Sequence, residues 1–242
     1  MFIFERDFFS LVVKFADKIQ RKHTLSYNKV LFAYTPIYVR LLGFADEQSI
    51  SEINPKWQSI LKQLPRRDNE QVDFFYRQHL QHEHCKTETT EQWFGCFRYH
   101  YHEKDNSYEL HFRASDLKGN LSSSRINQRR KELALMFQYI HKENRQNAKF
   151  FARTWLLNTE AFTRLFPKEF KEKTQLWPEH LTQDNTYWGQ FVNRNGKLKR
   201  DLSKKLITNV DMLSSTDIRD YFPLKGRITE IPLELLFRFY NI

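Results

Sequence analysis

Histidine and cysteine side chains, which are zinc ligands by type, are concentrated between positions 79 and 111. Of the nine His and two Cys in the chain, this stretch holds His79, His82, His84, Cys85, Cys96, His100, His102 and His111. Alternation along residues 94–102 predicts a strand that places His100 and His102 on the same face as Cys96. A bound metal and neutral imidazoles at the edge of the core are both open interpretations. The second is favoured, because the spacing matches neither C-x2-C nor H-E-x-x-H and His79 falls on an apolar helical face.

Aromatic and amide side chains gather in two further stretches, residues 150–167 and 187–197. The first has the pattern of a strand that turns at Asn158 into a helix ending at Pro167. The second has the pattern of a short strand closed by a turn at Asn195 and Gly196. A strand-to-helix turn exposes free backbone N–H groups, which bind anions or carbonyl oxygens. These stretches are therefore the predicted location of a ligand site.

The predicted ligand-binding side chains are Trp155, Asn158, Arg164, Trp188, Gln190 and Arg194. If the two stretches pair, the amides and guanidinium groups of this set meet in a polar pocket with aromatic walls. The competing interpretation makes Asn158 a helix N-cap and both tryptophans core residues with locally satisfied indole N–H groups. Gln190 and Arg194 are harder to explain by packing alone.

The sequence lacks the motifs of the established nucleophilic and nucleotide-binding classes. It contains no G-x-S-x-G, no P-loop, no G-x-G-x-x-G and no Cys–His pair at a recognisable spacing. The segment 40–45 fits the R-x-x-G-x-A form of an acetyl-CoA pyrophosphate loop, but Gly43 ends a predicted helix, whereas such a loop must precede one. Glu160, Glu169 and Glu172 are expected on solvated helix faces. No catalytic residue is assigned on these patterns.

Composition and charge indicate a globular, basic protein. The chain has 242 residues, 40% of them hydrophobic, and a formal net charge of +10. This charge favours polyanionic partners, but the basic residues are scattered without a nucleic-acid motif, so a solvated basic surface is preferred over a nucleic-acid face. There is no apolar run of about 18 residues and no basic start typical of a signal peptide. We expect a cytoplasmic protein without a membrane span; signal-less export and the oligomeric state stay open.

Helix signals dominate the first third of the chain. Apolar residues recur at helical spacing in 5–21, and the pairs Thr35–Pro36 and Asn54–Pro55 have the chemistry of helix starts. Asp68 begins a further predicted helix. After a polar break at 87–91 the period changes to two, which predicts a hairpin over 94–113. A long helix over 125–143, a charged helix over 202–210 and a tail over 228–242 complete the expected elements.

These elements predict an α+β protein. A helical region, 1–86, precedes an α+β region, 92–242, with a small mixed or antiparallel sheet and flanking helices, and the two regions can form one compact domain. Helices followed by a mixture of strands and helices, without regular alternation, argue against a doubly wound sheet.

The two stretches around Trp155 and Trp188 resemble an uncharacterised family of bacterial proteins. That family shows S-W-L-Y-N-x-x-A-Y-x-R-L-F-P followed by W-G-Q-F-x-x-x-x-G. Here the segments 154–158 and 161–167 resemble the first motif, and 188–191 with Gly196 resemble the second. The sequence departs from the pattern by Thr154 for Ser and by Leu157 and Phe162 for Tyr, which removes hydroxyl groups from any shared site. The histidine cluster is not part of the pattern, which weakens the zinc interpretation.

Residues 110–170 are similar, more distantly, to the C-terminal part of an acyltransferase-like family. That family has a helical N-terminal part and a GNAT-like C-terminal part with an S-W-L-L segment. The resemblance implies acyl-CoA as cofactor and a GNAT-like acyltransferase, or a degenerate relative, that binds a small anionic ligand beside Trp155, Asn158 and Trp188. The alternative is a non-catalytic basic protein that contacts nucleic acid or a protein partner.

Overall fold

The chain forms two compact units. The computed structural model describes residues 4–43, 51–85, 92–113, 121–177, 185–193 and 195–242, without the side chains of 83–85. Unit 1 comprises Met1–Glu88 and Glu179–Leu224, and unit 2 comprises Thr89–Pro178 and Lys225–Ile242. The first division falls inside the polar break at 87–91. The assignment of 179–224 to unit 1 adds a second segment to the helical region expected over 1–86.

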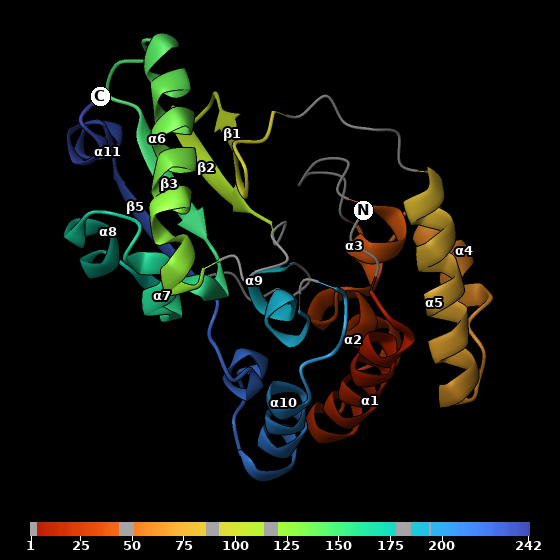
Figure 1. Cartoon of the computed structure of the whole chain (residues 1–242). Coiled ribbons are helices and arrows are strands. Elements are labelled where there is room, and N and C mark those ends of the chain that lie inside the picture. Colours follow the sequence, from red (N-terminus) through yellow and green to blue (C-terminus); the bar gives the residue numbers. More distant parts are fainter. Residues whose placement is uncertain (1–3, 44–50, 86–91, 114–120, 178–184, 194) are drawn as a thin grey trace. The chain divides into compact units, whose positions relative to one another are not determined.

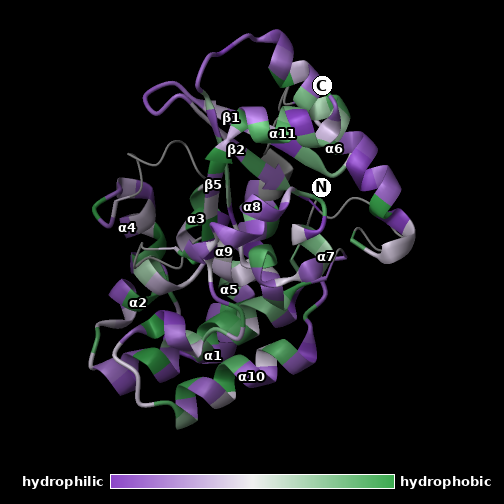
Figure 2. Cartoon of the chain, turned by 90° about the vertical axis from the view of Figure 1, so that its left-hand side faces the viewer, coloured by the Kyte–Doolittle hydropathy of each residue, from purple (hydrophilic) through white to green (hydrophobic). Residues whose placement is uncertain are grey.

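Unit 1 is built from helices. In the part of the chain that the structure describes they are α1 Arg6–His23, α2 Tyr27–Tyr34, α3 Ile37–Leu42, α4 Pro55–Lys62, α5 Asp68–Cys85, α9 Asn185–Trp188 and α10 Arg200–Met212, with the 3-10 helices η4 Gly189–Phe191 and η5 Ile218–Tyr221 (Figure 1). The expected start of α4 is confirmed, because Asn54 Oδ1 accepts hydrogen bonds from the N–H groups of Lys56 and Trp57 and Pro55 follows it. Hydrophilic and hydrophobic residues alternate around α10, which buries one side (Figure 2).

The core of unit 1 surrounds the fully buried Trp188. Phe8 and Phe15 of α1 meet its indole edge to face, with ring centroids 6.1 and 5.3 Å away. Phe222 contacts it from the segment after η5 at 5.4 Å. The indole N–H donates to the carbonyl oxygen of Tyr34 over 3.2 Å. Trp188 thus joins α1 to the second segment of unit 1.

The strand expected over 187–197 is wrong. Residues 185–191 form α9 and η4, and Val192 makes an isolated bridge to Leu198. The short apolar run is helical because Tyr187, Trp188 and Phe191 are buried together at helical spacing. The expected turn is present around Gly196, whose φ of 76° suits glycine.

Unit 2 is a mixed sheet with helices. Its described elements are β1 Phe97–His102, β2 Ser107–Phe112, η2 Ser123–Arg125, α6 Ile126–Lys142, β3 Lys149–Arg153, η3 Trp155–Asn158, α7 Glu160–Thr163, α8 Lys168–Glu172, β4 Gln175–Leu176, β5 Arg227–Pro232 and α11 Leu233–Tyr240. The strand order is β1-β2-β3-β5-β4. The pair β2–β3 is parallel and joined through α6, and the other pairs are antiparallel (Figure 1). The expected α+β class is confirmed, and the sheet is mixed.

The two faces of this sheet differ in chemistry. Tyr108, Leu110, Phe150 and Ile231 are buried in one cluster with apolar residues of α6, α8 and α11. Cross-strand pairing places the alternate residues on the opposite face, which we call the polar face: Arg98, His100 and His102 of β1, Glu109 and His111 of β2, Phe151 and Arg153 of β3. The hairpin and its alternation confirm the expectation for 97–112.

Strands β2 and β3 are paired along only part of their length. Their register covers Ser107–Glu109 and Lys149–Phe151, whereas β2 continues to Phe112 and β3 to Arg153. On their outer sides both stay paired, with β1 and β5 respectively. Among the described residues, β2 and β3 therefore stop pairing with each other after Glu109 and Phe151, inside the sheet.

Cys96 does not share the face of His100 and His102, which corrects the expected grouping. The chain turns at Gly95, whose φ is 64°, and strand alternation begins only at Phe97. The Cys96 side chain is fully buried in the apolar cluster. Its backbone N–H donates to Glu132 Oε2 over 3.1 Å.

Candidate functional site

The predicted ligand residues belong to two units. Trp155, Asn158 and Arg164 are in unit 2, whereas Trp188 and Gln190 are in unit 1. The predicted Arg194 lies outside the described residues. The contacts of each residue can therefore be stated within its own unit.

Gln190 satisfies backbone groups. Its side chain is fully buried. Nε2 donates to the carbonyl oxygens of Tyr187 and Leu224 over 2.8 and 3.0 Å, and Oε1 accepts from the Leu224 N–H over 2.9 Å. The Gln190 amide, which was hard to explain by packing from the sequence alone, thus links η4 to the end of the second segment of unit 1.

The interpretation of Asn158 as the N-cap of the following helix is wrong. Asn158 ends η3, and Thr159 precedes α7 without a capping side-chain bond. Asn158 Nδ2 donates to the carbonyl oxygens of Trp155 and Lys225, each over 2.7 Å, and Oδ1 accepts from Arg227 Nε over 2.7 Å. The 3-10 helix η3, which precedes α7, puts the Asn158 amide within reach of the residues that lead into β5.

Arg164 holds the chain that leads into α6. Its Nη2 donates to the carbonyl oxygen of Leu121 over 2.8 Å, and its Nη1 donates to Ser123 Oγ over 3.3 Å. Trp155 is partly buried against the apolar cluster of unit 2. Both side chains therefore make structural contacts within unit 2.

A different constellation of titratable groups lies on the polar face. Glu109 is buried, with 6% of the residue exposed. Its Oε2 lies 3.1 Å from His102 Nε2 and 4.0 Å from His111 Nε2, and its Oε1 lies 3.4 Å from Arg153 Nη2. His100 stands directly opposite Glu109 in the antiparallel register. A buried carboxylate between imidazoles and a guanidinium group can orient a proton-accepting histidine.

His111 is neutral at physiological pH. Burial lowers its pKa to about 3, and the charges of Arg98, His100, Arg153 and His102 contribute in the same direction. The physical cause is that a second positive charge is costly on a partly desolvated face already rich in cations. His111 therefore presents an uncharged nitrogen beside Glu109.

Indole rings support the guanidinium groups around this site. Arg113 stacks over Trp93 at 3.8 Å from the ring centroid, and Arg98 approaches the same ring at 5.3 Å. Arg153 lies over Trp177 at 4.8 Å. Cation–π contacts hold the positive charges on an aromatic support. We call Arg98, Arg113 and Arg153 the cationic rim.

The His and Cys cluster of residues 79–111, for which neutral imidazoles are the favoured interpretation, contains His100, His102 and His111 but does not include Glu109. The register now places Glu109 between these histidines. In the part of the chain that the structure describes, no group of three or more His, Cys, Asp or Glu side chains has the arrangement of a metal site. The alternation of polar residues on both strands of the hairpin was the signal for this acid–base cluster.

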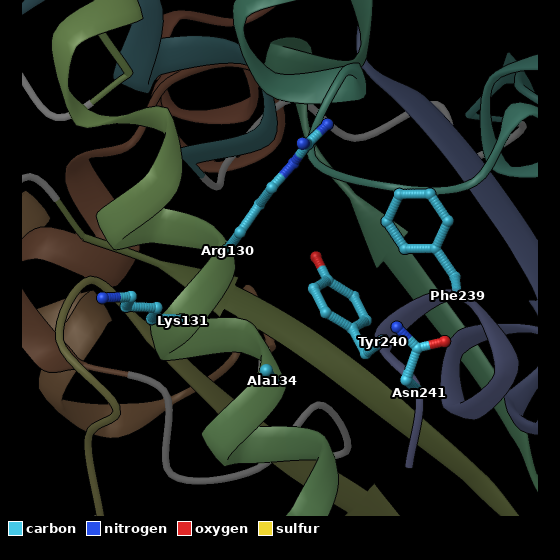
Figure 3. A pocket seen from close by; sticks show the side chains of 6 residues that line it. All are labelled: Arg130, Lys131, Ala134, Phe239, Tyr240 and Asn241. Carbon is cyan, nitrogen blue, oxygen red and sulfur yellow. The ribbon is translucent and has the colours of Figure 1, made fainter.

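An open hollow between α6 and α11 has different chemistry. It is lined by Arg130, Lys131, Ala134, Phe239, Tyr240 and Asn241 (Figure 3). Arg130 donates to the carbonyl oxygen of Arg164 over 3.2 Å, and the Tyr240 hydroxyl donates to that of Leu165 over 2.5 Å. Its lining contains no carboxylate or imidazole, so it offers no acid–base pair.

Comparison with known proteins yields no family assignment. No protein-family model, no curated protein and no solved structure matches the chain. Among the described residues no helix is long and apolar enough to cross a membrane.

Proposed function

We propose that this protein is an acyl-CoA-dependent acyltransferase with a GNAT-like sheet, whose acceptor site is the polar face around Glu109. The observation that carries the proposal is that the pairing of β2 with β3 ends at Glu109 and Phe151. Ligands of sheets with parallel strands bind beyond the carboxyl ends of these strands. The pairing stops just before the carboxyl ends of β2 and β3.

Backbone chemistry supports the binding of an acyl-CoA arm at this place. Backbone N–H and C=O groups inside a fold require partners, and beyond Glu109 and Phe151 the two strands do not supply these partners to each other. The arm of CoA carries amide groups that can pair with a strand edge. Leu121 and Ser123, shortly before α6, are held by Arg164, and the start of a helix favours phosphate groups.

The polar face supplies the residues for proton transfer. Acyl-CoA provides an activated thioester, so that a C–N bond forms with the acceptor amine, the C–S bond breaks and CoA leaves as the thiol. Glu109 accepts a hydrogen bond from His102 Nε2, which leaves Nδ1 of the same ring as the atom that takes the proton of the amine. Glu109 stabilises the resulting imidazolium, which gives this proton to the departing sulfur of CoA.

Thermal-shift titration tests binding. Ligand at about 100 times its Kd stabilises the folded state by about 2.7 kcal/mol, which corresponds to roughly 5 to 10 °C for a chain of this length. We expect acetyl-CoA and CoA to raise the melting temperature and ADP, which lacks the amide arm, to have a smaller effect. Absence of any shift with millimolar acetyl-CoA would refute the proposal.

The Glu109→Gln variant tests the role of the carboxylate. It should keep the acetyl-CoA shift but release CoA from acetyl-CoA and an amine panel about 100- to 10,000-fold more slowly, because a general base contributes a factor of this size and His102 loses the carboxylate that orients it. Glu160→Gln is the matched control, because Glu160 is exposed on α7 of the same unit. Equal rates for both variants would remove Glu109 from the mechanism.

A further inference from the structure

The charges around Glu109 are arranged in an order that bears on the acceptor. The carboxylate is recessed, with 8% of its side chain exposed, whereas 17% of the Arg153 side chain is exposed. Arg113 is more exposed than Arg153. Negative charge therefore lies inside and positive charge outside on the same face.

We propose that the acceptor is an amine that also carries an anionic group, phosphate or carboxylate. The amine approaches the Glu109–His102 pair, and the anionic group lies against the cationic rim. This inference rests on the proposed acyl transfer and adds the chemical class of its second substrate.

The cationic rim selects against a simple amine. An ammonium group that approaches Glu109 passes Arg98 and Arg153, whose charges repel it. The same charges favour its neutral form, which is the form that attacks a thioester. A covalently attached anion compensates the repulsion by pairing with a guanidinium group, and the planar donors of Arg suit the oxygens of both phosphate and carboxylate.

Aromatic support adds geometric order to the rim. Trp93 carries Arg98 and Arg113, and Trp177 carries Arg153. Stacked guanidinium groups lose less conformational freedom when they bind an anion than free side chains do. Arg98 lies on β1, where it is opposite His111, and Arg153 lies on β3, where its guanidinium group is 3.4 Å from Glu109. The two stacked groups therefore lie on the strands at either side of β2.

Calorimetric titration in the presence of CoA tests the inference without turnover. The paired probes are ethanolamine with O-phosphoethanolamine, glucosamine with glucosamine 6-phosphate, and pentylamine with 5-aminovalerate; inorganic phosphate serves as the anion without an amine. We expect the anionic member of at least one pair to bind roughly ten- to hundredfold more tightly, the effect of one charge-assisted hydrogen bond. The pair that discriminates identifies phosphate or carboxylate.

The Arg98→Gln variant assigns this preference to the rim. It should reduce the preference about tenfold and leave the acetyl-CoA shift in place, with Lys131→Gln on α6 as the control for a loss of one charge. An acetyl-CoA shift without an anionic preference, or inorganic phosphate binding as tightly as the anionic amines, would overturn the inference and leave the proposed acyl transfer intact. If Arg98→Gln instead loses the acetyl-CoA shift, the cationic rim binds CoA rather than the acceptor, and the inference is also overturned. Absence of the acetyl-CoA shift in the unaltered protein refutes both.

Discussion

Two buried polar side chains have different roles in this protein. Gln190 and Glu109 are both buried polar side chains, but Gln190 has all its partners on the backbone. Glu109 has its partners on titratable side chains. The first arrangement stabilises a fold, whereas the second can move a proton.

The pKa of His111 predicts how stability depends on pH. Its pKa falls from 6.5 to about 3 on folding, so between these values the unfolded state binds more protons and the free energy of unfolding rises with pH. Its contribution is complete above about pH 6.5 and is lost as the pH falls. Between pH 7 and 5, the free energy of unfolding measured with urea should therefore fall more for the unaltered protein than for His111→Gln. The difference between the two proteins should be less than about 1.4 kcal/mol per pH unit, because the imidazole stays partly exposed. Parallel curves in this range would contradict the prediction; above pH 7.5 they should be parallel.

Gln190→Met tests the structural role of the buried amide. The thioether has a similar shape but leaves two carbonyl oxygens and one N–H group without a partner, and we expect a loss of about 2 to 4 kcal/mol in the free energy of unfolding. Gln63→Met, at an exposed position after α4, should change it by less than about 0.5 kcal/mol. Chemical denaturation of both variants measures the difference. A Gln190 variant as stable as the control would return Gln190 to the ligand-binding set.

At the scale of elements, the turn at Gly95 before the hairpin packs against α6. Glu132 of α6 accepts from the Cys96 N–H and pairs with the buried Arg129 at 3.0 Å. A Cβ at Gly95 would overlap the Glu132 carboxyl group. The turn therefore requires glycine both for its positive φ and for the approach of α6.

Gly95→Ala should reduce the free energy of unfolding by at least about 1 to 2 kcal/mol, the cost of the left-handed conformation for a residue with a Cβ. The overlap with Glu132 adds to this cost. A double-mutant cycle with Glu132→Ala separates the two contributions by denaturation. We expect Gly95→Ala to cost less in that background, and an unchanged cost would show that the contact with α6 has no energetic role.

At the scale of the whole molecule, unit 1 is assembled from two separate segments of the chain. Phe15 of the first segment packs on Trp188 and Phe222 of the second, with ring centroids 5.3 and 5.6 Å away. The side chain of Lys22 donates to the carbonyl oxygens of Val210 and Leu213, each over 2.5 Å. Neither segment encloses this core by itself.

Fragments test this assembly. Residues 1–88 alone should show no cooperative thermal transition, because the faces of Phe8 and Phe15 lose their partners and remain exposed to water. The same residues joined by a Gly-Ser linker to 185–224 should melt cooperatively. Circular dichroism with temperature measures both. A cooperative transition of 1–88 alone would contradict the dependence on the second segment.

The elements that the sequence predicted correctly are those with local causes. The capped start of α4 at Asn54 and Pro55, the amphipathic α1 and the alternating hairpin depend on residues within a few positions of each other. The helical 185–191 was mistaken for a strand because a short apolar run has no distinctive period, and its packing on α1 comes from residues far away in the chain.

The sequence by itself determined the α+β class and the alternation that puts charged and imidazole side chains on one side of the hairpin. Only the tertiary structure decided that Glu109 lies between His102, His111 and Arg153, that β2 and β3 stop pairing beside it, and that Gln190 is fully occupied by backbone groups. The reason is that each of these features depends on contacts between segments distant in sequence, whose register and burial follow from the packing of the whole unit.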